Sequence, residues 1–115
     1  MSVKLSTRQV GDVSVLDVSG RITLGEGSSA LRDTLRDLMS KDHKKILLNL
    51  SEVSYIDSSG IGELVSGFTT VAHQGGQLKL LGLTKRVKDL LQITKLYTVF
   101  DVKDDEAVAI KSFGN

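Results

Sequence analysis

Residues 46–65 read ILLNLSEVSYIDSSGIGELV and contain the transition that decides the fold. The short apolar run at 46–50 is typical of a strand that is covered on both faces. From Ile61 onward, apolar residues recur at helical spacing as far as Ala72. A buried strand that feeds directly into an amphipathic helix indicates a crossover unit, so this segment predicts an α/β protein.

The rest of the chain continues the alternation of strands and helices. Two extended segments that hinge at Gly11–Asp12 predict an opening hairpin. Either Ser28 or Ser29 is expected to cap a first helix, and Thr84 to cap a third. The predicted order is ββαβαβαβα, a single domain over residues 1–115 with a largely parallel sheet. Outside the quoted segment, strands are predicted at 3–10, 13–18, 78–81 and 99–102. Helices are predicted where apolar residues recur from Leu31 and around Val87, and after Asp104–Asp105.

Composition narrows the classes of function. The chain has 115 residues, of which 40% are hydrophobic, with a formal net charge of +1. This balance argues against a disordered tail and against a tract that binds nucleic acid. The sequence has no cysteine and no apolar run near the roughly 20 residues that cross a bilayer. It also lacks the start of a signal peptide, so a soluble cytoplasmic domain without membrane or nucleic-acid partners is expected.

Ser58 and Ser59 lie where the buried strand ends and the helix begins. In open α/β sheets, functional sites gather at this carboxyl edge. A helix start carries unpaired N–H groups and a partial positive charge, so a serine there can cap the helix, bind an anion, or carry a phosphate. Asp57 or a serine as an ordinary N-cap is the simplest interpretation. Gly60 and Gly62 weaken it, because each lowers helix stability by about 1 kcal/mol and together they suggest accessible backbone.

Enzymatic interpretations lack the residues that they need. A serine nucleophile requires a base, but His43 precedes the apolar strand and His73 ends the helix that the serines begin. Val65 stands where a dinucleotide fingerprint needs its third glycine, and no P-loop pattern occurs. No His, Asp and Glu cluster has the spacing of metal ligands. The sequence therefore predicts no catalysis, no cofactor and no metal, although a small hydrolase remains an alternative.

A serine that another protein modifies is the hypothesis that remains. Phosphorylation adds about −1.5 to −2 charges and three acceptor oxygens. The helix dipole tolerates a phosphate at this end, whereas a partner packed over Gly60 and Gly62 is expected to be expelled. The chemistry fits a binding switch.

The hexapeptide Asp57-Ser58-Ser59-Gly60-Ile61-Gly62, with ILLNLSEVSYI before it and GGQLKLLGLTKRVKDLLQIT after it, closely resembles the STAS domain of bacterial anti-sigma factor antagonists. The likeness extends over nearly the whole chain. It implies a mixed, mostly parallel sheet with flanking helices. It also implies partner switching, in which the unphosphorylated antagonist binds an anti-sigma factor that is a serine kinase and so frees a sigma factor.

The resemblance also assigns residues. It implies that Ser58 is the phosphoacceptor, that the partner kinase supplies the phosphate from its own ATP, and that a serine phosphatase resets the switch. The neighbours expected to contact the partner are Asp57, Ser59, Gly60, Ile61 and Gly62.

One loop departs from the family pattern. Many members carry acidic residues just after the glycine that ends the second strand and two positions later, where this chain has Arg21 and Thr23. By the resemblance, this loop lies near the phosphoacceptor and contacts the kinase, so the replacements change the complementarity that selects a partner. An alternative function is a STAS scaffold or accessory subunit of a sensory or transport assembly, without routine phosphorylation.

Overall fold

Five strands form one sheet in the order β1-β2-β3-β4-β5 in the computed structural model, which describes residues 3–114. β1 pairs antiparallel with β2, and every other pairing is parallel. The observed order of elements confirms the predicted ββαβαβαβα and the mixed, mostly parallel sheet. The strands are β1 (Val3–Val10), β2 (Val13–Ile22), β3 (Lys45–Ile56), β4 (Gln77–Leu81) and β5 (Val102–Lys103), and the helices are α1 (Glu26–Ser40), α2 (Ser58–His73), α3 (Lys85–Ile93) and α4 (Glu106–Ser112).

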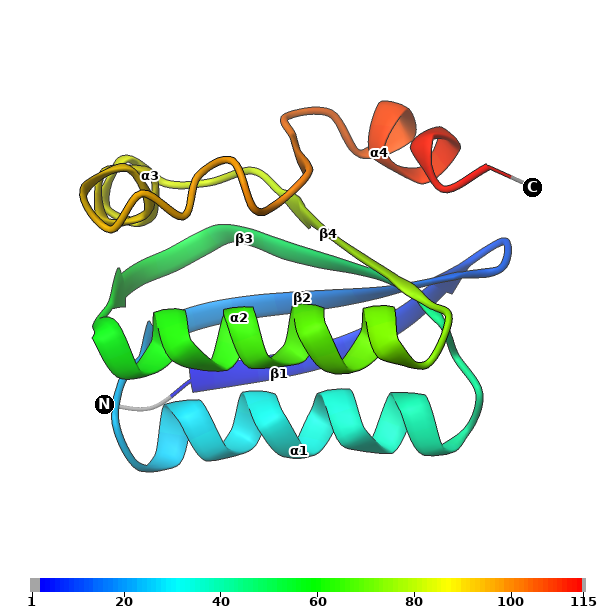
Figure 1. Ribbon diagram of the computed structural model, residues 1–115, viewed down its shortest axis with the longest axis horizontal. Coiled ribbons are helices and arrows are strands. Elements are labelled where there is room, and N and C mark those ends of the chain that lie inside the picture. Colours follow the sequence, from blue (N-terminus) through cyan, green and yellow to red (C-terminus); the bar gives the residue numbers. More distant parts are fainter. Residues whose placement is uncertain (1–2, 115) are drawn as a thin grey trace.

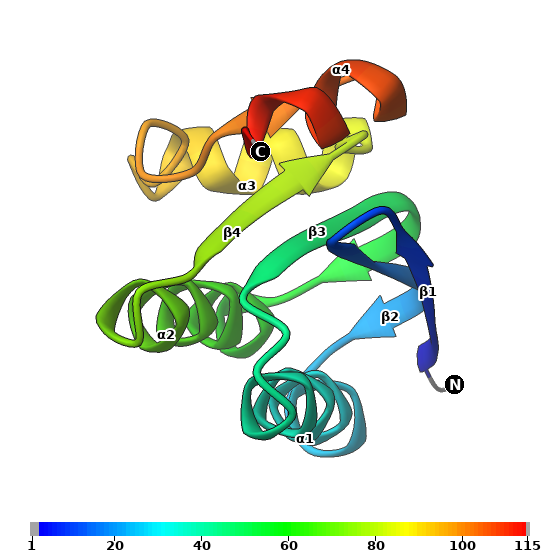
Figure 2. The same ribbon diagram turned by 90° about the vertical axis from the view of Figure 1, so that its right-hand side faces the viewer.

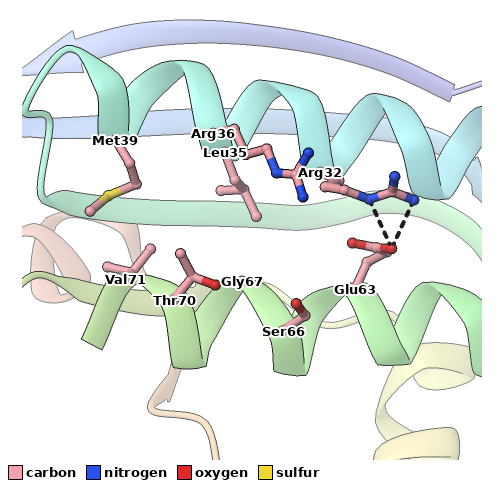
Figure 3. A pocket seen from close by; sticks show the side chains of 9 residues that line it. All are labelled: Arg32, Leu35, Arg36, Met39, Glu63, Ser66, Gly67, Thr70 and Val71. Atoms are coloured by element: carbon pink, nitrogen blue, oxygen red, sulfur yellow. Dashed lines mark hydrogen bonds and ion pairs between the residues drawn. The ribbon is translucent and has the colours of Figure 1, made fainter. Parts of the chain in front are cut away.

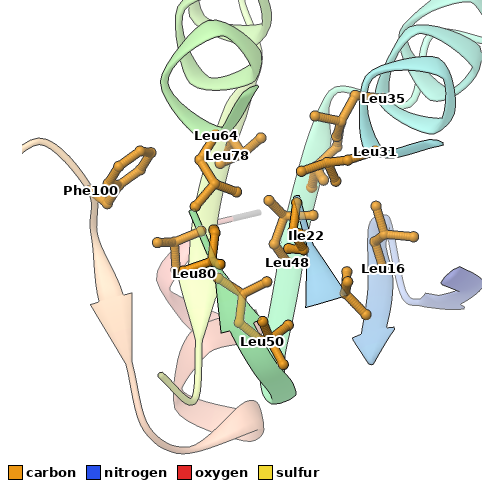
Figure 4. Close-up of a cluster of buried hydrophobic side chains, with 14 of the residues drawn as sticks. Leu16, Ile22, Leu31, Leu35, Leu48, Leu50, Leu64, Leu78, Leu80 and Phe100 are labelled. Atoms are coloured by element: carbon orange, nitrogen blue, oxygen red, sulfur yellow. The ribbon is translucent and has the colours of Figure 1, made fainter. Parts of the chain in front are cut away.

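Helices cover both sides of the sheet. α1 and α2 lie side by side on one face, and α3 and α4 lie on the other (Figures 1 and 2). The main core forms where apolar side chains from the strands meet those of the helices (Figure 4). Leu16, Ile22 and Leu48 come from the strands, and Leu31 and Leu64 come from α1 and α2, and all five are fully buried. Because β2, β3 and β4 are parallel, their carboxyl ends meet at one end of the sheet, where α2 and α3 begin (Figure 1).

The last strand is shorter than the sequence predicts. β5 contains only Val102 and Lys103, and the expectation that Val99 and Phe100 belong to it is wrong. Phe100 instead is nearly buried and packs edge-on against Phe68 of α2, with ring centroids 5.6 Å apart. A turn over the preceding residues places this ring in the core, so the ladder begins only at Val102 opposite Leu80.

The cap of the first helix was also predicted wrongly. α1 is capped by Gly25, which has no side chain for the purpose, and Ser28 lies inside the helix and is only 3% exposed. A β-carbon on Gly27 would lie 2.8 Å from the carbonyl oxygen of Arg21, so this helix start packs directly against the end of β2. The close approach turns Ser28 toward the interior. In contrast, the predicted cap of α3 is confirmed, because the Thr84 hydroxyl accepts a hydrogen bond from the Val87 N–H.

Two irregularities near the end of β2 set the register at the carboxyl edge. The pairing with β3 shifts between Asp17 and Ser19 and again between Gly20 and Arg21. After these shifts, Arg21 pairs with Tyr55 and Ile22 pairs with Ile56. The two isoleucines are buried, so Arg21 and Tyr55, which precede them, point to the opposite face of the sheet.

Candidate functional site

Asp57 joins two segments at the carboxyl end of the sheet. It is the N-cap of α2, and its Oδ1 accepts a hydrogen bond from the Gly60 N–H at 2.9 Å. Its Oδ2 accepts a second bond from the backbone N–H of Leu24 at 3.1 Å. One carboxylate therefore satisfies a free donor of the helix and also fixes the loop between β2 and α1 against the start of α2.

The two serines after Asp57 have different environments. The Ser59 hydroxyl lies 2.8 Å from the Ser28 hydroxyl, which itself donates to the carbonyl oxygen of Thr23 at 3.0 Å. Since Ser28 has one hydroxyl proton, Ser59 must be the donor between the two serines. Ser58, the first residue of α2, is exposed, and its hydroxyl has no hydrogen bond to any residue in the range 3–114. Ser58 therefore presents the available hydroxyl.

The two glycines of the segment, Gly60 and Gly62, have different surroundings. A β-carbon on Gly60 would lie 2.5 Å from the carbonyl oxygen of Ile22 and 2.6 Å from the side chain of Ile56. Gly60 is buried, so the expectation that it leaves backbone accessible to a partner is wrong. It allows the start of α2 to touch the end of β2. A β-carbon on Gly62 would meet nothing within 4 Å, and this glycine is exposed beside Ser58. Ile61 is 4% exposed and packs into the core.

The loop that departs from the family pattern lies against the start of α2. Thr23 contributes through its backbone, because its carbonyl accepts from both the N–H and the hydroxyl of Ser28. The Arg21 side chain is exposed, and its guanidinium carbon lies 4.4 Å from the centroid of the Tyr55 ring. The Arg86 guanidinium lies over the same ring at 4.3 Å. Tyr55 and Arg86 were missed by sequence reasoning, since only the shifted register of β2 reveals this cluster.

Neither His43 nor His73 lies near Ser58 to act as a general base. His73 is at the far end of the 16-residue helix α2, roughly 20 Å along its axis. His43 lies beside Gln9, with 3.4 Å between their side-chain nitrogens. Within residues 3–114, no group of His, Asp or Glu side chains is arranged to hold a metal ion. The Ser58 hydroxyl lies at the positive end of the α2 dipole, beside the Asp57 carboxylate that caps the helix.

A groove of about 330 Å³ runs between α1 and α2, beyond the first turn of α2 (Figure 3). Leu35, Met39 and Val71 form its apolar part, and the ion pair between Arg32 and Glu63, at 3.2 Å, closes one end. Ser58 does not line it. The candidate site is therefore the exposed surface around Ser58 and not this groove.

Shifted pKa values occur away from Ser58. Arg8 of β1 donates hydrogen bonds to Asp17 and Glu106 and lowers the pKa of each carboxyl group below its usual value. Lys79 similarly lowers the pKa of Asp101. The Arg8 pairs link β1, β2 and α4, and the Lys79 pair lies at the β4–β5 edge of the sheet. The lowered pKa values therefore reflect ion pairs that support the fold.

The mixed five-stranded sheet with two helices on each face is an α/β domain with an exposed helix start at the carboxyl end of its strands. The model of the STAS domain family matches residues 4–109, and the chain belongs to that family. Within residues 3–114, no helix has the length and hydrophobicity that crossing a membrane requires.

The named relatives are regulatory proteins. An anti-sigma-B factor antagonist of Bacillus subtilis is 31% identical over 102 residues, which cover 89% of this chain and 92% of the relative. The protein of the same name from Listeria monocytogenes is 27% identical over 106 residues, which cover 92% of this chain and 91% of the relative. The family therefore associates this chain with anti-sigma factor antagonists.

Solved structures agree on the fold. An anti-sigma factor antagonist from Mycobacterium paratuberculosis superposes with a TM-score of 0.88 at 18% identity, covering 99% of this chain and 96% of that one. The Bacillus protein SpoIIAA, solved in unphosphorylated and phosphorylated forms, gives a TM-score of 0.73 at 18% identity and covers 95% of this chain in both forms. The two forms cover 96% and 98% of their own chains.

Proposed function

We propose that this chain is an anti-sigma factor antagonist that works by partner switching. With Ser58 unphosphorylated, it binds an anti-sigma factor that is also a serine kinase and thereby releases a sigma factor. The kinase then phosphorylates Ser58 and the complex separates, and a serine phosphatase restores the first state. The observation that carries the proposal is the free, exposed Ser58 hydroxyl at the start of α2, next to a Ser59 hydroxyl that is already bonded.

The helix start supports a phosphate without unfolding. Ser58 follows the N-cap, so a phosphate on its hydroxyl lies near free backbone N–H groups and the positive end of the helix dipole. The hydrogen bonds of Asp57 and of Ser59 do not involve the Ser58 side chain. Phosphorylation therefore changes the surface and leaves the contacts beneath it in place.

The same phosphate opposes a docked partner. Ser58 and Gly62 are exposed together, and the nearby Leu24 side chain is 81% exposed. A partner that covers this surface must accommodate a new group and remove water from a charge of about −1.5 to −2. Burying such a charge without a partner charge is strongly unfavourable, so the complex weakens.

The protein itself catalyses nothing in this scheme. Ser58 lacks a base, and the phosphoryl group comes from ATP bound to the kinase. Four residues of the segment support the site through internal contacts: Asp57, Ser59, Gly60 and Ile61. The surface that the partner contacts is provided by Gly62, by Arg21 and by the loop around Thr23.

Phosphoryl transfer by the cognate kinase tests the proposal. We expect purified chain, kinase and ATP to give one phosphate per chain, and the Ser58→Ala variant to give none. Ser59→Ala is the matched control, because it removes the neighbouring hydroxyl and leaves Ser58 free. Equal incorporation into Ser58→Ala protein contradicts the assignment, and so does a Ser58→Asp variant that binds the kinase as tightly as the wild type.

A further inference from the structure

Two arginines share one tyrosine at the carboxyl end of the sheet. Arg21 is the next-to-last residue of β2, Tyr55 holds the same place in β3, and Arg86 is the second residue of α3. Both guanidinium carbons lie within 4.4 Å of the Tyr55 ring centroid. Cation–π attraction therefore gives both flexible side chains a common anchor on the surface.

Neither guanidinium is neutralised. In the part of the chain that the structure describes, several cations have carboxylate partners, such as Arg8 with Asp17 and Lys85 with Asp89. Within that part, Arg21 and Arg86 have none, and neither has the exposed Arg36 of α1. Both lie within 4.4 Å of one centroid, so the two guanidinium carbons are separated by at most twice that distance. This upper bound is close to the Debye length of about 8 Å at physiological ionic strength, so salt screens their mutual repulsion only in part. An anion bound beside them relieves this repulsion.

Stacking leaves the polar edges of both groups available. A guanidinium that stacks through its face keeps the N–H donors that lie in its plane, and their fork geometry matches a carboxylate. Arg21 and Arg86 are both exposed. Arg21 lies near the end of β2, Arg86 at the start of α3 and the exposed Ser58 at the start of α2. These element ends share one end of the sheet (Figure 1).

We propose that Arg21 and Arg86 are specificity-determining residues that bind carboxylates on the protein docked over Ser58. The inference rests on the proposed function for the nature of this partner, a kinase, and adds its chemistry: its contact surface is acidic. A phosphate on Ser58 adds negative charge at the end of the sheet where those carboxylates bind. Repulsion between the phosphate and the partner's acids then adds to the desolvation that separates the complex.

A protein surface fits better than nucleic acid. The formal net charge of the chain is only +1, and two anchored guanidiniums make a compact contact, not the basic stripe that follows a phosphate backbone. A compact pair of forked donors suits one or two carboxylates on a folded partner.

Charge reversal at the two arginines tests the inference. The binding of the cognate kinase is measured at low and at physiological ionic strength for wild type, Arg21→Glu and Arg86→Glu. Arg36→Glu is the matched control, because Arg36 is an exposed arginine of α1 beside the groove between α1 and α2. We expect each reversal at the tyrosine cluster to weaken binding about tenfold or more and to reduce its salt dependence, with Arg36→Glu within about twofold of wild type.

Phosphorylation of Ser58 is followed in the same samples, so the two proposals can fail separately. Unchanged affinity of Arg21→Glu and Arg86→Glu, or equal loss in Arg36→Glu, overturns the inference even if Ser58 is phosphorylated. Arginine-dependent binding without phosphorylation of Ser58 supports the inference and contradicts the proposed function. Acid-to-lysine changes in the kinase that restore binding to Arg21→Glu provide further support.

A second measurement needs no kinase. The chain has two tyrosines and no tryptophan, so Tyr97→Phe leaves Tyr55 as the sole tyrosine. The NMR signals of its ring are followed during titration with a glutamate-rich peptide and with a glutamine-rich peptide of equal length. We expect shifts with the glutamate peptide alone, and their loss in Arg86→Gln. No response, or a stronger response to a single-stranded oligonucleotide, overturns the inference.

Discussion

Arginines at the two ends of the sheet are used in different ways. At the end with the β1–β2 hairpin and α4, Arg8 donates to Asp17 at 2.7 Å and to Glu106 at 2.7 Å (Figure 1). At the end where α2 begins, Arg21 and Arg86 rest on Tyr55 and have no carboxylate partner in the described residues. The paired arginine links β1, β2 and α4, whereas the unpaired arginines leave their donors free.

The difference teaches how the chain separates folding from recognition. The charges of Arg8, Asp17 and Glu106 neutralise one another and hold three elements together. The two arginines on Tyr55 remain unpaired at the end of the sheet where α2 begins (Figure 1). The start of α2 shows the same division on a smaller scale, with Asp57, Ser59 and Gly60 turned to internal contacts and Ser58 and Gly62 turned outward. Substitutions can therefore tell whether each residue supports the fold or the surface.

The largest effect is expected at Gly60. Gly60→Ala places a methyl group against the Ile22 backbone, which cannot move away as a flexible side chain can. We expect the free energy of unfolding to fall by about 1–3 kcal/mol in denaturant titrations. Gly62→Ala is the control in the same helix turn, and it should raise stability by up to about 1 kcal/mol, because its methyl group meets open space. Equal effects of the two substitutions would contradict the distinction between Gly60 as an internal contact and Gly62 as exposed surface.

Asp57→Ala should have the next largest effect. The substitution removes the cap of α2 and the bond to Leu24, so we expect a loss of about 2 kcal/mol in unfolding free energy. Asp105→Ala removes the cap of α4, which makes only the bond to Val108, and should lower stability by about 1 kcal/mol. A loss at Asp57 no greater than that at Asp105 would show that the loop does not depend on the second bond.

Arg8→Gln tests the opposite end and should lower stability by about 1 kcal/mol at neutral pH, since the ion pairs are partly exposed. Arg8 lowers the pKa of both Asp17 and Glu106 in the folded protein. Their contribution is thus complete above their unfolded pKa values of about 3.9 and 4.3, and it is lost as pH falls through the lower folded values. Acid titrations should show a flatter decline below pH 4 in Arg8→Gln than in wild type. If the unfolding free energies of Arg8→Gln and wild type fall in parallel below pH 4, groups other than Asp17 and Glu106 cause the acid sensitivity.

The smallest effect on stability is expected at Ser58. Its exposed hydroxyl makes no hydrogen bond within residues 3–114, so Ser58→Asp should change the unfolding free energy by less than about 0.5 kcal/mol. Ser59→Ala should cost about 1 kcal/mol, because it removes the bond to Ser28. Thermal unfolding of both variants checks this order, and a marked loss in Ser58→Asp would show that the site is part of the supporting structure.

Sequence reasoning predicted the order of elements because local spacing specifies them. The runs at 46–50 and 61–72 and the glycine turns required no knowledge of distant residues. Roles that depend on packing were not predictable. Gly60 is buried because the start of α2 touches the Ile22 backbone, and Ser28 is buried because Gly27 lies against the Arg21 carbonyl. Tyr55 and Arg86 meet only after the register of β2 has shifted, so no periodicity in the sequence reveals their contact with Arg21.

The two hydrogen bonds of Asp57 bear on the proposed phosphorylation of Ser58. A phosphoacceptor in a flexible segment must be ordered in the active site, at an entropy cost of about 1–2 kcal/mol for each residue that is fixed. Here the backbone on both sides of Ser58 is already held when the chain has folded. The proposed kinase would therefore recognise the shape of a folded helix start. We expect it to phosphorylate an isolated peptide of residues 53–65 far less efficiently than the intact domain.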